Sequence, residues 1–193
     1  MKRLFVWVFT FTLFLNACTE ASLQEETPKP NTENNNEQVL NLIQQTLIWA
    51  DSENSINLLP IVLEDSIYTR FDLEQHQQNL NKLSATSLFS QEFINNYDNI
   101  ILHLDKKLRN GEFEYGPWYL GDLPPFNFAS EANPWCNCQD NASWESIQIK
   151  HLGEKTFIWS WGQRWKDFKY QFRVSEEDGK LKIAYMEGFE IEK

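Results

Sequence analysis

The sequence predicts an α+β domain in which N-terminal helices pack on one face of a curved C-terminal antiparallel sheet. In the first part of the chain, apolar residues recur with the 3.6-residue period of amphipathic helices. From Trp144 to Tyr185, apolar and polar side chains alternate, as they do in strands that bury one face. Helices followed by a run of strands are typical of the α+β class.

Residues 1–17 have the layout of an export signal. Lys2 and Arg3 precede an apolar run, Leu4 to Leu15, that is shorter than the ~20 residues of a membrane-spanning helix. The run ends at Ala17-Cys18, which resembles the lipobox of bacterial lipoproteins, although Asn16 departs from the usual small or β-branched residue. An ordinary secreted protein with an incidental Cys18 is the alternative.

Lipidation of Cys18 with palmitate-type acyl chains would anchor the mature protein firmly to a membrane of the bacterial cell envelope. Thr19 follows the cysteine, so no acidic retention signal is apparent and the outer membrane is favoured, with the protein facing the periplasm or the outside. Residues 18–37 are polar and contain proline and asparagine without an apolar face, which predicts a flexible tether. Residues 38–193 are predicted to form a single domain.

The chain is strongly acidic. Its formal charge is −11, and removal of Lys2 and Arg3 with the signal leaves about −13. Nucleic acids and anionic headgroups would repel such a chain, whereas a basic protein or a cation would be attracted. Solubility alone is the simpler explanation of the charge.

Helices are expected at residues 38–50, 73–83 and 88–109. Asp72 and Gln75 form a capping-box pattern before the second helix. Basic residues in the last turn of the third helix and Gly111 just beyond it match the usual end of a helix. Residues 56–63 are apolar but contain Pro60, which rules out a long regular helix there.

Four strands are expected between Trp144 and Tyr185, the last two joined by a tight turn at Glu177-Asp178-Gly179. Between helices and strands, residues 111–143 contain four prolines and many aromatic residues. This segment is expected to be a packed loop rather than a disordered one.

Three segments carry a family resemblance: SQEFINNY in the third helix, LPPFNFASEANPWCNCQD before the strands, and the closing hairpin DGKLKIAYMEGFE. With them the chain resembles the nuclear-transport-factor-2-like (cystatin-like) superfamily, and more narrowly a family of uncharacterised bacterial lipoproteins within it. The resemblance covers residues 39–185. It implies a cone-shaped fold in which the sheet wraps the long helix and leaves a pocket, a feature that enzymes and binding modules both use.

Cys136 and Cys138, separated by one residue, admit three interpretations. With Asp140 and His151 they form an acceptable zinc set, but structural zinc usually needs a second cysteine pair. A redox catalyst usually has C-x-x-C at a helix start. An oxidising compartment and Pro134 favour a disulfide within the loop, with free or intermolecular thiols still open. No bound metal and no cofactor are predicted.

Catalytic residues are not predicted. A base in a cone-fold pocket could be Asp98, His103, Asp105 or Asp140, but the apolar stripe of the long helix excludes Asp98 and Asp105, which are expected to face solvent. His103 lies beside that stripe, where a packed histidine is more common than a base. His76 and His151 have no partner in the sequence.

The aromatic residues of the 117–140 loop are the candidate ligand-binding residues. Either they form a rim around a pocket or they belong to the core. The candidates are Trp118, Tyr119, Phe126, Trp135 and Asp140. The favoured function is a non-enzymatic, lipid-anchored binding module for a small ligand or a protein. The alternatives are an inhibitor or immunity-type protein that blocks a basic cell-wall-active enzyme, and a pocket enzyme that uses Asp140.

Overall fold

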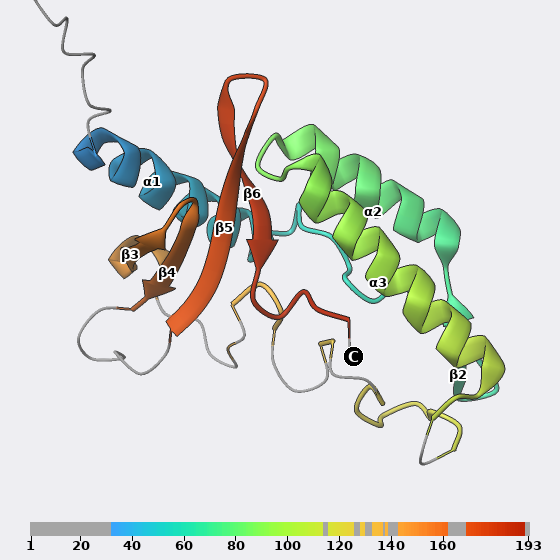
Figure 1. The fold of residues 1–193 in the computed structure, drawn as a ribbon. Coiled ribbons are helices and arrows are strands. Elements are labelled where there is room, and N and C mark those ends of the chain that lie inside the picture. Colours follow the sequence, from blue (N-terminus) through green and yellow to red (C-terminus); the bar gives the residue numbers. More distant parts are fainter. Residues whose placement is uncertain are drawn as a thin grey trace, which may run out of the picture. The chain divides into compact units, whose positions relative to one another are not determined.

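The computed structural model describes residues 32–113, 116–125, 128–129, 133–136, 138, 143–161 and 169–191. The signal, Cys18 and most of the predicted tether lie outside these residues, as do Phe126 and Asp140. The elements are α1 (Thr32–Ala50), β1 (Ile61–Glu64), β2 (Ile67–Phe71), α2 (Leu73–Thr86), α3 (Gln91–Asn110), a 3-10 turn (Trp144–Ser146), β3 (Gln148–Gly153), β4 (Thr156–Ser160), β5 (Lys169–Glu177) and β6 (Lys180–Met186). The predicted α+β class, with helices before a C-terminal antiparallel sheet, is confirmed (Figure 1).

The C-terminal strands form an antiparallel meander in the order β3-β4-β5-β6. Alternation along the strands brings aromatic residues of neighbouring strands together on one face. Phe157 of β4 lies opposite Phe172 of β5, and Trp159 lies opposite Tyr170. All four side chains are buried, and such cross-strand pairs are the units that stabilise a sheet.

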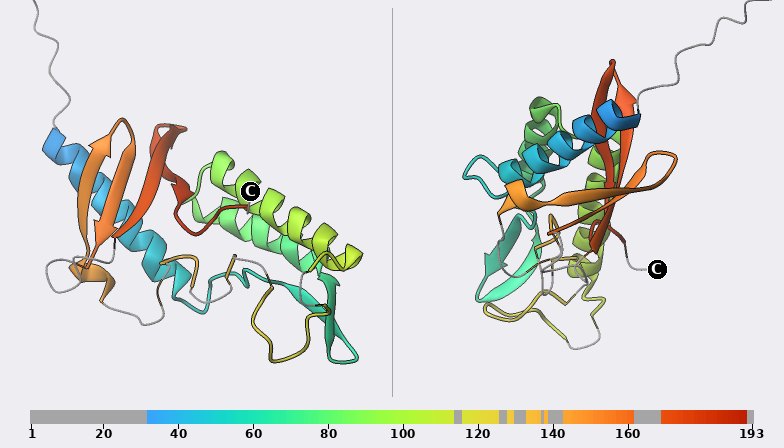
Figure 2. Two further views of the ribbon diagram at one scale, coloured as in Figure 1. Left: turned by 60° about the horizontal axis from the view of Figure 1, so that its bottom comes forward. Right: turned by 90° about the vertical axis from the view of Figure 1, so that its left-hand side faces the viewer.

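Helix α1 crosses one face of this sheet, because it contacts both outer strands, β3 and β6 (Figures 1 and 2). Its apolar stripe, Val39, Leu42, Ile43 and Leu47, is buried against the core. Helix α3 instead contacts β6 and β2. The expectation that the sheet wraps the long helix was therefore wrong for α3, since α1 occupies the face of the sheet.

Helices α2 and α3 begin and end close to the predicted residues. The carboxylate of Asp72 accepts hydrogen bonds from the N–H groups of Glu74 and Gln75, and the Ser90 hydroxyl accepts one from the N–H of Phe93. Helix α3 ends at Gly111, whose φ of 64° is left-handed. Just before α3, the backbone of Leu88–Ser90 exchanges two hydrogen bonds with Ile183, which holds the start of α3 against β6.

A hairpin formed by β1 and β2 was not predicted. Its turn uses Asp65 and Ser66 at φ values of 48° and 66°, without the glycine or asparagine that usually indicates such a turn. Pro60 was expected to rule out a long regular helix, and the structure has none there: Pro60 directly precedes β1 and its carbonyl accepts a hydrogen bond from the N–H of Asp72. Trp118 and Leu120 pair with the other side of β2 and its turn.

Candidate functional site

A groove of about 510 Å³ lies between α3, β6 and the C-terminal tail. One wall comes from α3 and the other from β5, β6 and the residues that follow β6. The described lining consists of Glu92, Asn95, Asn96, Asn99, Arg173, Ala184, Tyr185, Phe189, Glu190 and Ile191.

The α3 wall is a polar stripe, defined here as Glu92, Asn95, Asn96 and Asn99. Their spacing of i, i+3, i+4 and i+7 places them on one side of the helix. The buried residues of α3, including Phe93, Tyr97 and Ile100, form the opposite stripe. The helix therefore binds the core with one side and presents amides and a carboxylate to the groove with the other.

A β-bulge shapes the opposite wall. Arg173 of β5 pairs with Tyr185 of β6, but Val174 pairs with Ile183, so Ala184 is an extra residue on β6. A bulge changes the direction of the side chains around it. Here it lets Ile183 and Met186, three residues apart, both bury in the core while Tyr185 lines the groove.

Arg173 and Glu92 form an ion pair at the groove. Nη1 and Nη2 of Arg173 donate to the two carboxylate oxygens of Glu92, at 3.0 and 2.6 Å. The hydrogen bond from Arg173 lowers the pKa of Glu92, and the same bond raises the pKa of Arg173. The two charges therefore neutralise each other within the groove.

Tyr185 supplies a neutral hydroxyl. It donates a hydrogen bond to the carboxylate of Glu190. Burial is the main cause that raises the pKa of Tyr185, and the bond to Glu190 and its negative charge raise it further. The phenol consequently stays protonated far above neutral pH, and the Glu190 carboxylate is held in place by it.

The asparagines of α3 are partly engaged by neighbours. The Asn96 amide nitrogen donates to the carbonyl of Phe189 at 2.9 Å, and the Asn95 amide oxygen accepts from Gln91 at 2.8 Å. This leaves the Asn95 amide nitrogen and the Asn96 amide oxygen without a hydrogen-bond partner among the described residues. Among the described residues, no protein hydrogen bond engages the side chain of Asn99.

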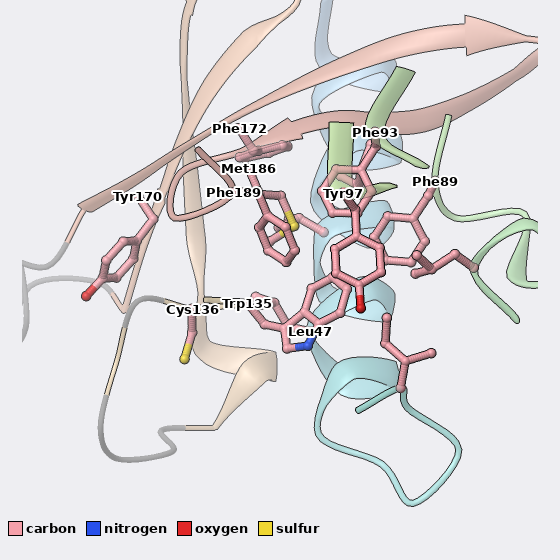
Figure 3. Close-up of a cluster of buried hydrophobic side chains, with 14 of the residues drawn as sticks. Leu47, Phe89, Phe93, Tyr97, Trp135, Cys136, Tyr170, Phe172, Met186 and Phe189 are labelled. Carbon is pink, nitrogen blue, oxygen red and sulfur yellow. The ribbon is translucent and has the colours of Figure 1, made fainter. Parts of the chain in front are cut away.

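The floor of the groove is tied to the cysteine loop through Phe189 and Trp135, whose ring centroids lie 4.9 Å apart. Cys136 and Cys138 are joined by a disulfide, and the N–H of Asn133 donates to the carbonyl of Cys138 at 3.1 Å. This closes a small loop around Trp135. Figure 3 shows Trp135, Phe93, Tyr97 and Phe189 gathered in one cluster, with Cys136 beside it.

Gly188 lets the tail pass close to this loop. An added Cβ at Gly188 would lie 3.0 Å from the carbonyl oxygen of Pro134, and its φ of 93° disfavours other residues. Only glycine therefore fits where the tail crosses the loop.

The described lining of the groove contains none of the aromatic residues of the 117–140 loop. Trp118 and Trp135 are 5% and 4% exposed and belong to the core, so the rim interpretation was wrong for these two residues. Trp118 packs on Tyr68 and donates its indole N–H to the carbonyl of Asp122. Tyr119 is about half exposed but lies beside β2, outside the groove lining.

Asp105 was expected to face solvent, and that expectation was wrong. Its carboxylate is buried, accepts the N–H of Phe71 at 2.8 Å and binds Nε of Arg109 at 2.7 Å. Asp105 thus joins α3 to the end of β2. Helical spacing could not reveal this, because the partner comes from a hairpin that the sequence did not predict.

Asp98 also has a partner that spacing did not reveal. Its carboxylate lies 2.8 Å from Nε2 of His76, a buried histidine of α2 whose ring packs on Tyr97. The pair links α2 to α3, away from the groove lining. His103 is half buried, and the exposed His151 stacks on Phe157.

Metal binding has little support in the part of the chain that the structure describes. No group of three or more histidine, cysteine or acidic side chains there is arranged to hold an ion. Cys136 and Cys138 bond to each other, so they offer no thiolates. Asp140, the third residue of the zinc set, lies outside the described residues.

Among the described helices, none is long and apolar enough to cross a bilayer.

The chain matches no protein-family model, no curated protein and no solved structure. The resemblance to the cystatin-like lipoproteins therefore remains an expectation from the sequence. Function has to be argued from the groove itself. The amide stripe of α3 was visible in the sequence as NNYDN, but the β6 bulge and the tail that complete the groove were not.

Proposed function

We propose that this chain is a lipid-anchored binding module of the bacterial cell envelope, and that the groove between α3 and β6 is its binding surface. The observation that carries the proposal is the composition of that groove: amide, hydroxyl and carboxylate groups on both walls of a concave surface. Polar groups that converge in a concave site fix the orientation of a small ligand and provide specificity.

Binding is favoured over catalysis by the state of the charged groups. In the described lining, Glu92 is paired with Arg173 and Glu190 accepts from Tyr185. A general base needs a carboxylate or imidazole that is free to take a proton from a substrate. Both groove carboxylates instead accept a hydrogen bond from a neighbouring side chain, which suits a rigid, preorganised surface.

The groove is tested with a variant that fills it. Asn99 is exposed on α3, so Asn99→Trp adds bulk to the groove without removing a core contact. The full chain, purified in detergent, is unfolded thermally with neutral, cationic and anionic small solutes. A solute that binds the native state raises Tm by mass action. We expect such a rise for at least one class and its loss in Asn99→Trp; no rise for any class would overturn the proposal.

Anchoring is tested separately at Cys18. A bacterial host fed a labelled fatty acid is expected to label the wild-type chain and retain it in the membrane fraction. Cys18→Ala should abolish both the label and the retention, because the acyl chains provide the membrane affinity. Retention of Cys18→Ala in the membrane would contradict lipid anchoring and leave the groove proposal unaffected.

A further inference from the structure

The ligand class follows from the charge and hydrogen-bonding groups of the groove. We propose that the groove binds a neutral saccharide, held by the asparagines of α3 and by Tyr185. This inference rests on the proposed function and adds the identity of the ligand to it.

Charge excludes anionic ligands. The described lining holds one cation, Arg173, and its two guanidinium nitrogens are bound to Glu92. Glu190 adds a second carboxylate without a matching cation in that lining. A phosphate or carboxylate ligand would face net negative charge, and the guanidinium that could bind it already pairs with the Glu92 carboxylate.

The amides match the hydroxyl groups of a saccharide. An asparagine side chain offers two N–H donors and a carbonyl acceptor, and a hydroxyl both donates and accepts. Asn95 retains free donors, Asn96 retains a free acceptor, and Asn99 retains both among the described residues. Asn95 and Asn99 are one helical turn apart, so their free groups can meet neighbouring hydroxyls of one ligand.

The opposite wall favours a saccharide over a peptide. Tyr185 presents an aromatic ring that is amphipathic and is held by Glu190, which suits the C–H faces of a sugar ring. The apolar lining otherwise consists of Ala184, which is short, Phe189, which is 1% exposed, and Ile191, which is 38% exposed. Only Ile191 therefore offers a peptide side chain a large exposed apolar contact, and the polar side chains of the lining outnumber the apolar ones.

The experiment uses the full chain in detergent, labelled with ¹⁵N, and follows the side-chain amide signals of Asn95 and Asn99. Three probes are titrated: the tetramer of N-acetylglucosamine, which is neutral, the tetramer of glucosamine, which is cationic, and capped tetra-alanine, a neutral peptide. We expect saturable shifts of both amides with the N-acetylglucosamine tetramer and weaker binding of capped tetra-alanine. Binding of the cationic tetramer no tighter than that of the neutral one is expected if the amides and Tyr185, rather than the Glu190 carboxylate, hold the ligand.

Variants assign the binding to the groove. Asn95→Ala and Asn99→Ala should each weaken binding of the neutral saccharide about 5- to 10-fold, the effect of losing roughly one hydrogen bond. Asn81→Ala is the matched control. Asn81 is an exposed helical asparagine that accepts from a glutamine four residues earlier, as Asn95 does, but it lies on α2 outside the groove lining.

The outcomes separate this inference from the proposed function. Tighter binding of the peptide at the same amides would overturn the saccharide, and tighter binding of the cationic tetramer would overturn the neutrality of the ligand; either result would leave a binding groove. Saccharide binding that Asn95→Ala, Asn99→Ala and Asn81→Ala affect equally would overturn the assignment to this groove. Absence of any amide shift with all three probes would overturn the saccharide. If, in addition, no small solute raised the Tm of the wild-type protein, the binding function would be overturned as well.

Discussion

Trp135 packs against Phe189 with ring centroids 4.9 Å apart, and Phe189 forms the floor of the groove. Trp135 also contacts Trp49 of α1 and Phe93 of α3. One residue of the disulfide loop therefore joins three segments that are distant in sequence. Trp135 therefore supports the site through Phe189 and, within the described lining, does not itself face the groove.

Trp135→Ala should destabilise the protein strongly. Removing a buried tryptophan leaves a cavity, and such truncations cost about 3–5 kcal/mol of unfolding free energy. Chemical denaturation measures the loss. Tyr119→Ala, a truncation of a half-exposed aromatic residue of the same segment, is the control and should cost far less. If Trp135→Ala left the unfolding free energy unchanged while binding was lost, Trp135 would belong to a rim after all.

Loss of the disulfide should have a smaller effect. The bond closes a very short loop, for which the chain-entropy relation gives about 1.5 kcal/mol. We expect Cys136→Ser/Cys138→Ser to lower the unfolding free energy by about that amount while Trp135 remains buried, as its fluorescence would report. Wild-type protein in a reductant should match the double variant. A loss as large as that of Trp135→Ala would mean that the loop cannot hold Trp135 without the bond.

The ion pair of Glu92 and Arg173 should make stability depend on acid pH. Because the pKa of Glu92 is lowered in the folded state, its contribution is present above the ordinary value of 4.5 and is lost as pH falls through the folded pKa. Glu92→Gln should therefore be less stable than wild type at pH 7, by under about 1 kcal/mol for so exposed a pair, and the difference should shrink below pH 4.5.

Glu74→Gln provides the control for that measurement, since Glu74 is also an acidic residue in the first turn of a helix. Both substitutions remove a favourable charge at a helix N-terminus. Only Glu92→Gln also removes the charge that pairs with Arg173. Equal pH profiles for the two variants would mean that the pair contributes nothing to stability.

Asp105→Ala should show that this carboxylate is structural. Its removal leaves the buried N–H of Phe71 without an acceptor and frees Arg109, which should cost about 2–3 kcal/mol of unfolding free energy. Asp105→Asn keeps an acceptor for Phe71 and should cost about half as much. Binding at the groove should not change in either variant that remains folded. An unchanged unfolding free energy would indicate that Asp105 is free for another role.

Capping residues and the alternation of apolar and polar side chains predicted the helices and strands where these patterns are present. Asp72 and Gly111 marked the ends of helices because capping depends on a few adjacent residues. Alternation predicted all four strands of the meander, since burial of one face imposes a period of two. The β1–β2 hairpin was missed because Asp65 and Ser66 adopt positive φ without a turn signature.

The candidate site was predicted less well. Trp118 and Trp135 were left open between a pocket rim and the core, because nothing in a loop sequence distinguishes an aromatic residue that is exposed from one that fills the core, and the structure buries both. Asp105 and Asp98 were placed by helical spacing alone, which describes one helix and not its neighbours. Their partners, Phe71 and His76, come from β2 and α2.

The sequence by itself determined the α+β class, the start of α2 and the end of α3, the meander and the even pair of cysteines available for a disulfide. Each of these depends on residues that are close in the chain. Tertiary structure alone decided that α1 covers the sheet, that Trp135 is buried, and that the amides of α3 face Tyr185 across a groove. The reason is physical. The bulge at Ala184 arises from the pairing of β6 with β5, and Phe189 is placed by its packing on Trp135. Both are interactions between different segments of the chain, which no local pattern records.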